Sequence, residues 1–488
     1  MKKFKILLGF ILVLTLVGCS SSAATPGGAV PPQKPDAGDA DNNEYLELRE
    51  QNFISTVADN KVNVSLDSSN AAYSNLRKLI NNLQSIPTDA VNIEQMLNYF
   101  TYSYENDSED QLKSYLEIAR CPWNDENYLL SVAVKAKEFQ LEENRPNNFV
   151  FLLDISGSMY AEDKLPLMIK AFKILVDNLK DNDRVSIVTY AGTESILLDG
   201  GYGFEKAKIS AIISDLSAGG STAGSQGIQR AYELAQKHYI EGGNNRVFLA
   251  TDGDFNVGLS KIGDLKKFIS EKRETGVYLS LLGFGTGNLK ADTMDTLAQA
   301  GNGNYYYIDT LLEAQKVFIK ELGGTLQTVA KDAKVQVEFN KEIVEKYRLI
   351  GYENKQLTDE EFDNSETDAG EIGAGHVTVC LIEITLKELV DDAEIARCTV
   401  RYKDALDNEL NKEAITICNG ITANPSSEFL FQSAVAEFGL VLRNSKYKHN
   451  ASLPKVVSRI VDNKLDSDDY RREFLRLVLK YMNDYVRR

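Results

Sequence analysis

Residues 148–159 read Asn148-Phe-Val-Phe-Leu-Leu-Asp-Ile-Ser-Gly-Ser-Met159, an apolar run that ends in a series of oxygen-bearing side chains. The apolar run, residues 149–153, predicts a strand buried on both faces, as in a parallel sheet. Asp154, Ser156 and Ser158 follow at every second position, so a carboxylate and two hydroxyls leave the strand end together. Such oxygen groups suit a hard cation, and open α/β sheets bind ligands at the carboxyl ends of their strands. Taken alone, the motif fits a Ser/Gly-rich turn with a capping Asp154 equally well.

The pattern around this stretch alternates between strands and helices from residue 146 to residue 325. Buried strands are expected over residues 184–189, 246–251 and 277–282, a short edge strand over 195–198 and a final strand over 304–308. Amphipathic helices are expected over residues 165–179, 205–216, 225–239, 261–274 and 291–300. This alternation predicts an α/β fold with a doubly wound, mostly parallel sheet.

Two further loops of this region present oxygen groups. Gly219-Gly220-Ser221-Thr222 precedes an expected helix, and Asp252 directly follows a buried strand. Together with the opening motif they form the series Asp-x-Ser-x-Ser, a distant Thr and a distant Asp. This series resembles the metal-ion-dependent adhesion site of von Willebrand factor type A domains at all five positions. The matching residues are Asp154, Ser156, Ser158, Thr222 and Asp252.

The resemblance implies how these residues would hold a cation. The three hydroxyl residues would bind the ion directly, whereas Asp154 and Asp252 would act through bound water and by orienting the hydroxyls. Because three neutral hydroxyls compensate little of a divalent charge, a position would stay open for an acidic residue of a protein partner. Mg²⁺ is expected because few carboxylates and retained waters suit it, whereas Ca²⁺ would prefer more oxygen ligands. Mn²⁺ could substitute for Mg²⁺.

Other interpretations of these loops fit less well. The segment that starts at Asp252 begins like an EF-hand loop, but Val257 and Gly263 stand where that loop needs its Gly and its bidentate Glu. No Gly-Lys-Ser/Thr follows the opening motif, so it is not a phosphate loop. Ser156 and Ser158 lack a Gly-x-Ser-x-Gly elbow, and metal catalysis would need a base and usually more anionic or imidazole ligands. The chain is therefore expected to be a binding protein and not an enzyme.

The N-terminus predicts export and lipid attachment. Three lysines precede an apolar segment, residues 6–17, that is too short to span a bilayer comfortably. It ends in Leu16-Val17-Gly18-Cys19, which resembles a bacterial lipobox, so residues 1–19 would be a lipoprotein signal peptide and Cys19 the lipidated first residue. Residues 20–43 contain almost no large apolar side chains and are expected to form a disordered tether. The protein is thus expected at the extracytoplasmic face of a bacterial cell membrane or outer membrane.

Length, charge and cysteine content set further bounds. The 488 residues indicate two or three domains, and the formal net charge of −17 argues against nucleic-acid binding through phosphates. Five Cys and three His are too few and too scattered for a zinc site with recognisable spacing. In an exported protein Cys121, Cys380, Cys398 and Cys418 could form disulfides, but buried reduced thiols fit the sequence as well.

The type A region, residues 146–325, lies between an α+β region, residues 44–145, and a β-rich region, residues 326–488, that ends in helices. Strands over residues 128–135 and 334–339 are expected to pair, which would insert the type A region into one β-rich domain. A helix is expected to begin at Pro87, and an acidic loop is expected over residues 360–371.

Several short sequence segments in both flanks resemble a group of bacterial lipoproteins that carry the type A domain. These segments are the expected helix with Tyr73 and Arg77, and residues 98–100, 121–123, 348–354 and 368–376. This resemblance implies no biochemical activity. The last of these segments, residues 368–376, is expected to be a structural turn.

The preferred hypothesis is a lipid-anchored, extracytoplasmic protein that engages a protein partner through a divalent cation. The alternative is an envelope assembly or structural factor in which the metal only stabilises the fold. A third hypothesis is an envelope hydrolase, for which a recognisable His/Asp/Ser set is missing.

Overall fold

The computed structural model describes residues 45–66, 69–138, 146–191, 193–220, 227–253, 262–286, 289–321, 328–388, 393–405 and 410–485. All of these residues belong to one compact unit, Asp41–Arg488. Thr222, Cys19, the expected signal segment and the expected tether lie outside the described residues. Within the described ranges, no helix combines the length and the apolar content needed to cross a membrane.

The described part of the type A region contributes six strands to one sheet: β5 (Asn147–Asp154), β6 (Arg184–Tyr190), β7 (Glu194–Tyr202), β8 (Asn244–Thr251), β9 (Val277–Gly283) and β10 (Tyr305–Tyr307). Their order is β10-β9-β8-β5-β6-β7. Neighbouring strands run parallel except β7, which is antiparallel to β6. The structure thus confirms the doubly wound, mostly parallel sheet, although β7 is longer than the edge strand expected over residues 195–198.

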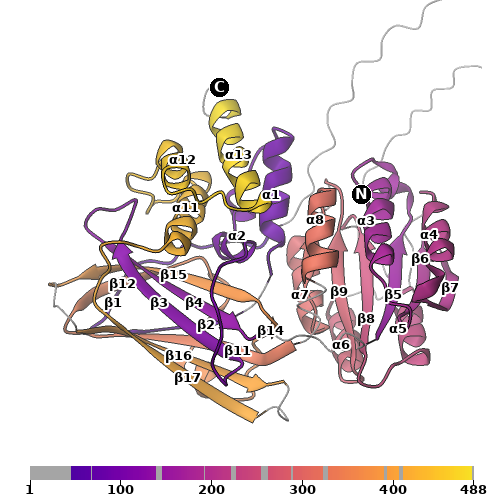
Figure 1. Cartoon of the computed structure of the whole chain (residues 1–488), viewed down its shortest axis with the longest axis horizontal. Coiled ribbons are helices and arrows are strands. Elements are labelled where there is room, and N and C mark those ends of the chain that lie inside the picture. Colours follow the sequence, from indigo (N-terminus) through magenta and orange to yellow (C-terminus); the bar gives the residue numbers. More distant parts are fainter. Residues whose placement is uncertain are drawn as a thin grey trace, which may run out of the picture. The chain divides into compact units, whose positions relative to one another are not determined.

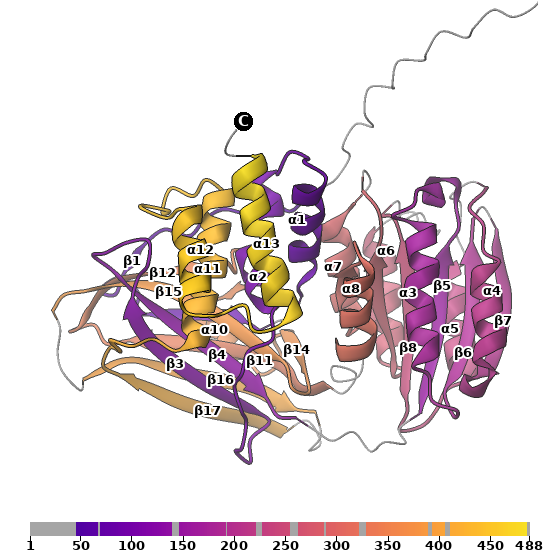
Figure 2. The ribbon, with the colours of Figure 1, turned by 45° about the horizontal axis from the view of Figure 1, so that its top comes forward.

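Helices cover both faces of this sheet (Figures 1 and 2). The residues of β5 divide between the two layers: Phe151 and Leu153 pack with α3 (Leu165–Asp177), and Val150 and Leu152 pack with α5 (Gly227–Lys237). Burial on both faces explains why this strand is apolar at consecutive positions. The other helices are α4 (Lys206–Ser214), α6 (Ile262–Arg273), α7 (Ala291–Ala300) and α8 (Leu311–Gln315), which continues as a π-helical turn, Lys316–Glu321.

The flanking regions contribute strands to two further sheets: β1 (Ile54–Ser55), β2 (Lys61–Ser65), β3 (Leu112–Arg120), β4 (Tyr128–Ala136), β11 (Thr328–Phe339), β12 (Val344–Ile350), β13 (Gln356–Leu357), β14 (Gly370–Gly373), β15 (Val377–Leu386), β16 (Glu394–Asp404) and β17 (Leu410–Asn419). One sheet has the order β1-β12-β15-β4-β3. The other has the order β13-β2-β11-β16-β17, with β14 paired to β11. Each sheet therefore combines strands that precede the type A region with strands that follow it. Residues of both sheets share one apolar core, which includes Val62, Leu130, Val337 and Ile382.

The two flanks thus form one β-rich domain into which the type A region is inserted, but the expected strand pair is wrong. Strand β4 pairs with β3 and β15, whereas β11 pairs with β2, β14 and β16. Every residue of β4 is buried, so this strand needs partners along both edges, and β3 supplies one of them. The sequence pattern does not reveal β3, because its polar and apolar residues do not alternate strictly.

Helices pack on the side of the five-stranded sheet that faces away from the second sheet (Figure 2). They are α1 (Ala71–Asn81), α2 (Ile93–Asn98), α11 (Ser427–Leu442), α12 (Leu453–Asp462) and α13 (Asp469–Asp484). Their apolar faces form a core with Leu129, Ala133, Val379 and Leu381 of the sheet. The helix expected to begin at Pro87 is instead a 3₁₀ turn, Thr88–Ala90, followed by α2.

Two further expectations for the flanks are resolved by the structure. The acidic loop expected over residues 360–371 is partly regular, because α10 (Asp359–Asp363) begins with a capping box formed by Thr358 and Glu361 and β14 follows it. The four described cysteines, Cys121, Cys380, Cys398 and Cys418, are buried free thiols. The structure thus agrees with the reduced alternative for these residues.

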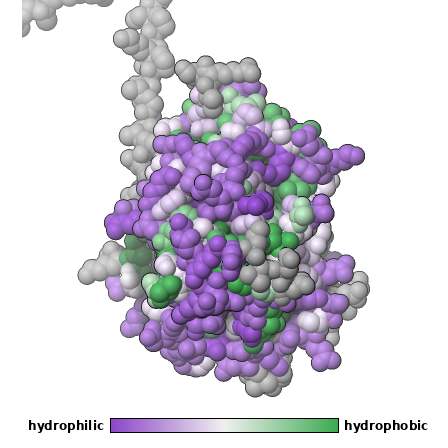
Figure 3. Space-filling view, turned by 90° about the vertical axis from the view of Figure 1, so that its left-hand side faces the viewer, coloured by the Kyte–Doolittle hydropathy of each residue, from purple (hydrophilic) through white to green (hydrophobic). Residues whose placement is uncertain are grey.

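The side of the β-rich domain that lies on the left of Figure 1 is predominantly hydrophilic (Figure 3). Hydrophobic residues appear on it only in small, separate patches. Scattered exposed apolar residues are normal on soluble domains. The described part of this face therefore indicates no apolar docking surface.

Candidate metal-binding site

The predicted site lies at the carboxyl ends of two adjacent central strands. Asp154 is the last residue of β5, and Asp252 directly follows β8, which pairs with β5 in parallel. Parallel pairing brings these two ends to the same edge of the sheet. The Thr251 hydroxyl donates a hydrogen bond to Asp154 Oδ2 at 3.1 Å, which ties the two strand ends together.

The residues of the opening motif point toward one another. Ser156 Oγ and Ser158 Oγ are 3.0 Å apart, close enough for one small cation to contact both. The Ser156 amide donates to Asp154 Oδ1 at 2.9 Å, so this carboxylate holds the loop in its turn. Asp154 and Ser156 are fully buried. Of the five predicted residues, the structure brings Asp154, Ser156, Ser158 and Asp252 to one edge of the sheet, and Thr222 lies outside the described residues.

Burial raises the pKa of the Asp154 carboxyl, and the nearby charge of Asp252 adds to this effect. Hydrogen bonds from Ser156 and Thr251 act in the opposite direction by favouring the carboxylate. Tyr190, the last residue of β6, is also fully buried, and its hydroxyl lies near Thr251 and the carboxylates of Asp154 and Asp252. This hydroxyl therefore adds one more buried oxygen atom beside the two carboxylates.

The glycines of the second predicted loop serve a close backbone approach. The Gly219 amide donates to the Ile155 carbonyl at 2.8 Å, and the Gly157 amide donates to the Gly220 carbonyl at 3.3 Å. Gly220 has a φ of +82°, and a Cβ on it would lie 2.8 Å from the Ala191 carbonyl oxygen. The residues that lead toward Thr222 are therefore bound directly to the Asp154–Ser158 loop.

Lys164 is a member of the site that the sequence analysis did not identify. Its Nζ donates to Asp252 Oδ2 at 2.8 Å, and both side chains are buried. Lys164 occupies the N-cap position of α3 and makes no side-chain capping bond. A cation is unfavourable at a helix N-terminus. A lysine just before an expected helix therefore indicates that an acidic side chain elsewhere in the chain binds it. Its partner is 88 positions away in the chain, and the sequence pattern does not connect the two.

The residues present fit a hard divalent cation. Two adjacent serine hydroxyls and two buried carboxylates supply oxygen atoms, which are the ligands that Mg²⁺ prefers. Among the described residues, no group of three or more His, Cys, Asp or Glu side chains is placed to hold a metal ion, so a cation here would depend on the serine hydroxyls. His238, the one histidine in the sequence of the type A region, contacts Asp199 of β7 at 2.6 Å.

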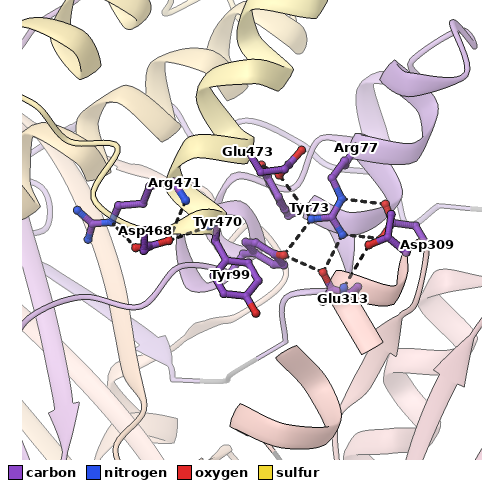
Figure 4. Close-up of polar contacts among 10 residues, drawn as sticks. Tyr73, Arg77, Tyr99, Asp309, Glu313, Asp468, Tyr470, Arg471 and Glu473 are labelled. Carbon is purple, nitrogen blue, oxygen red and sulfur yellow. Dashed lines mark hydrogen bonds and ion pairs between the residues drawn. The ribbon is translucent and has the colours of Figure 1, made fainter. Parts of the chain in front are cut away.

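A second polar cluster joins the type A region to the β-rich domain (Figure 4). Arg77 of α1 donates to both carboxylate oxygens of Asp309 and to Glu313 Oε2, the latter at 2.7 Å. It also donates to the Tyr99 hydroxyl at 2.9 Å and contacts Glu473 of α13 at 3.5 Å. We call this cluster the Arg77 junction. Burial raises the pKa values of Asp309 and Glu473, although Arg77 acts in the opposite direction on both.

The residue after Arg77 brings α1 close to the predicted site. Lys78 Nζ contacts Asp163 Oδ2 at 2.5 Å. Asp163 directly precedes Lys164, which binds Asp252. Two consecutive residues of α1 therefore contact the type A region, one at α8 and the other beside the predicted metal site.

The chain matches three family profiles in succession. The profile described as von Willebrand factor matches residues 39–131, von Willebrand factor type A domain matches residues 148–321, and uncharacterized protein YfbK, C-terminal, matches residues 324–483. The matched type A domain suggests a protein-interaction or adhesion-type function.

Individual proteins show the same similarity. Uncharacterized protein YfbK of Escherichia coli (strain K12) is 39% identical over 458 residues, which cover 88% of this chain and 79% of that protein. Uncharacterized protein sll0103 of Synechocystis sp. is 26% identical over 294 residues, 58% of this chain and 67% of that protein. A solved structure, von Willebrand factor type A from Catenulispora acidiphila, aligns with 77% of this chain and 92% of its own at 15% identity and a TM-score of 0.43.

Proposed function

Because the chain belongs to the family of Escherichia coli YfbK and carries a von Willebrand factor type A domain, we propose that it is a non-enzymatic binding protein that holds a protein partner through a divalent cation. The observation that carries this proposal is the pair of serine hydroxyls, 3.0 Å apart, beside the buried carboxylates of Asp154 and Asp252. Hydroxyl ligands leave a cation with most of its charge, and an acidic side chain of a partner supplies the missing negative charge.

The five residues of this site would have two different roles in binding the cation. Ser156, Ser158 and Thr222 would hold the ion directly, while Asp154 and Asp252 orient the hydroxyls and act through bound water. Asp154 is suited to this role because it accepts hydrogen bonds from the Ser156 amide and the Thr251 hydroxyl. Mg²⁺ is the proposed cation, with Ca²⁺ or Mn²⁺ as possible replacements, and when bound it offers a coordination position to an anionic oxygen.

Metal binding is tested by calorimetric titration of the full chain with MgCl₂. Asp154→Ala and Thr222→Ala should each weaken Mg²⁺ binding by about tenfold or more, because each removes one part of the oxygen set. Asp199→Ala is the matched control, since this acidic residue belongs to the same domain but lies at β7. If both variants bind Mg²⁺ like the parent, the assignment of the site is wrong.

The proposed location rests on the lipobox and the tether. Lipid on Cys19 would anchor the chain at the extracytoplasmic face of the cell membrane or outer membrane, because two or more acyl chains bind a bilayer stably. Labelling of cells with a palmitate analogue, followed by membrane fractionation, tests this. The parent should carry the label in the membrane fraction, and Cys19→Ala should lose both. A labelled Cys19→Ala protein would contradict the lipidation site.

A second candidate function is an envelope assembly or structural factor in which the cation only stabilises the fold. The complete burial of Asp154 and Asp252 favours it, because a cation would also neutralise these buried charges. Chelator treatment separates the two functions. Loss of crosslinking to a partner in cells without a change in circular dichroism supports the binding protein, whereas unfolding of the type A domain supports the structural factor.

A further inference from the structure

The Lys164 side chain contacts the predicted metal site and packs closely against the backbone at Gly285. Its Nζ donates to Asp252 Oδ2 at 2.8 Å, and it keeps 8% of its surface exposed, whereas Asp252 is fully buried. The stem of Lys164 passes directly over Gly285, where a Cβ would lie only 2.4 Å from Lys164 Cγ. Gly285 has a φ of +75°, and its carbonyl accepts a hydrogen bond from the buried Tyr307 hydroxyl. The lysine is therefore held in position by the backbone around it.

A purely structural role explains this contact poorly. A buried ion pair gives little net stability, because desolvation of both charges offsets their attraction. The N-terminus of α3 also opposes a positive charge at this position. Both costs would disappear with an apolar residue in place of Lys164 and an uncharged one in place of Asp252. The ammonium instead lies on one of the carboxylates that belong to the predicted metal site.

The charges of the site indicate what the lysine does. Asp154 and Asp252 carry two negative charges, and Lys164 compensates one of them. A divalent cation would then leave the site with one net positive charge, whereas without Lys164 the loaded site would be neutral. Buried net charge is costly unless an opposite charge pairs with it. A single carboxylate from a partner would bring the sum to zero.

We propose that Lys164 is a specificity-determining residue that makes the metal-loaded site selective for a single carboxylate, an Asp or Glu side chain of the protein partner. This inference rests on the proposed function and adds to it a reason for the acidic partner. Lys164 acts through Asp252 and need not touch the partner itself. Its own neighbour Asp163 is held by Lys78 of α1, so the position of Lys164 also depends on the β-rich domain.

The test uses the full chain loaded with Mn²⁺, and acetate serves as the probe carboxylate. Water-proton relaxation reports how much water Mn²⁺ retains, and acetate lowers the relaxation enhancement when it displaces that water. Lys164→Met should need about tenfold more acetate for the same effect, because it removes one positive charge from a poorly solvated site. It should bind Mn²⁺ at least as tightly as the parent, because the metal no longer competes with the ammonium for Asp252.

A charge-matched double variant separates charge from geometry. Lys164→Met with Asp252→Asn removes one positive and one negative charge, so its Mn²⁺-saturated site has the same net charge as the parent. Its acetate response should return toward the parent value, and Lys164→Arg should keep it. The thermal unfolding midpoint of each variant confirms that the compared proteins are folded.

The outcomes distinguish the inference from the function on which it rests. A parent chain that binds no Mn²⁺ would refute the proposed function itself. A parent that binds Mn²⁺, together with a Lys164→Met variant that responds to acetate like the parent, would refute only the role of Lys164. A double variant that stays as weak as Lys164→Met would also overturn it, because the lysine would then act by shape and not by charge.

Discussion

The predicted metal site and the Arg77 junction are both clusters in which buried carboxylates outnumber the cations that contact them. At the metal site, Asp154 and Asp252 are accompanied by Lys164. At the junction, Asp309, Glu313 and Glu473 surround Arg77. The two clusters differ in what lies around the surplus negative charge. Serine hydroxyls and tight glycine turns surround it at the metal site, whereas tyrosine hydroxyls close the junction with hydrogen bonds.

The surplus negative charge is therefore neutralised in a different way in each cluster. Burial raises the pKa values of Asp309 and Glu473, as it raises that of Asp154 at the metal site, so the clusters differ mainly in the groups that surround the carboxylates. Tyr99 donates to Glu313, and Tyr73 donates to Glu473, so each hydroxyl occupies a carboxylate oxygen that a cation would otherwise use. At the metal site the hydroxyls of Ser156 and Ser158 lie 3.0 Å apart, close enough to bind one cation together. We therefore expect protons to complete the junction and a divalent cation to complete the metal site.

The largest effect is expected from Arg77→Met. This change leaves the buried carboxylates of Asp309 and Glu313 and the partly buried carboxylate of Glu473 without their shared guanidinium, and breaking a buried pair in this way costs ~3–5 kcal/mol. The difference in the free energy of unfolding between the parent and Arg77→Met, from urea titration at pH 7, measures this loss of stability. The difference should become smaller at lower pH as the carboxylates take up protons. Arg49→Met is the control, because its pair with Glu47 is exposed and should not change the stability measurably. A loss for Arg77→Met as small as that of the control would show that the junction is not a stabilising contact.

The two clusters also differ in how much of them the sequence predicts. Asp154, Ser156 and Ser158 are contiguous, and Asp252 follows a recognisable buried strand, so local pattern suffices to find them. Arg77, in contrast, meets Asp309 across 232 positions and Glu473 across 396. No periodicity of either segment encodes such a meeting, because it depends on how whole domains pack.

The same limit applies to the fold. The type A sheet is readable because its parallel strands are continuous apolar runs separated by amphipathic helices. In the flanks, the strand over residues 128–135 is readable as a strand, but its pairing with β3 and β15 is not. Pairing is decided by which strands compete for each edge once both flanks have met, and the sequence of one strand does not contain that information.

A smaller effect on stability is expected from a change of pH, and it tests whether protons neutralise buried carboxylates in this chain. Burial raises the pKa of Glu371 from 4.5 to about 8, and that of Glu94 from 4.5 to about 7. Each has a buried carboxylate oxygen with no hydrogen-bond partner in the described part of the chain. The folded chain therefore binds more protons than the unfolded chain in this range. The contribution of each group to stability is fully present below pH 4.5 and is lost as the pH rises through about 7 for Glu94 and about 8 for Glu371.

Thermal unfolding midpoints between pH 4.5 and 8 measure this dependence. Glu371→Gln imitates the protonated carboxyl, so its midpoint should fall less steeply with pH than that of the parent. Glu366→Gln is the control, because this exposed residue lies just before β14, between α10 and that strand. Equal slopes for the parent and Glu371→Gln would mean that Glu371 is ionised in the folded chain, and the role assigned to protons would then fail at this residue.

The smallest effect is expected from Lys78→Met, which lies between the two clusters and tests whether they are separate. Its contact with Asp163 is partly open to solvent, since 35% of the Asp163 side chain is exposed, so its loss should cost only ~0.5–1 kcal/mol of stability. The Lys78 ammonium also lies near that of Lys164, whose repulsion lowers the pKa of Lys78 together with the larger effect of burial. Removing this positive charge should therefore help a divalent cation to bind, by about twofold in Mn²⁺ affinity. Opposite signs for the two measurements would show that one lysine supports the domain contact and opposes the metal. If stability and Mn²⁺ affinity fall together, and Lys78→Arg restores both, Lys78 instead holds the metal loop in shape and the two clusters form a single network.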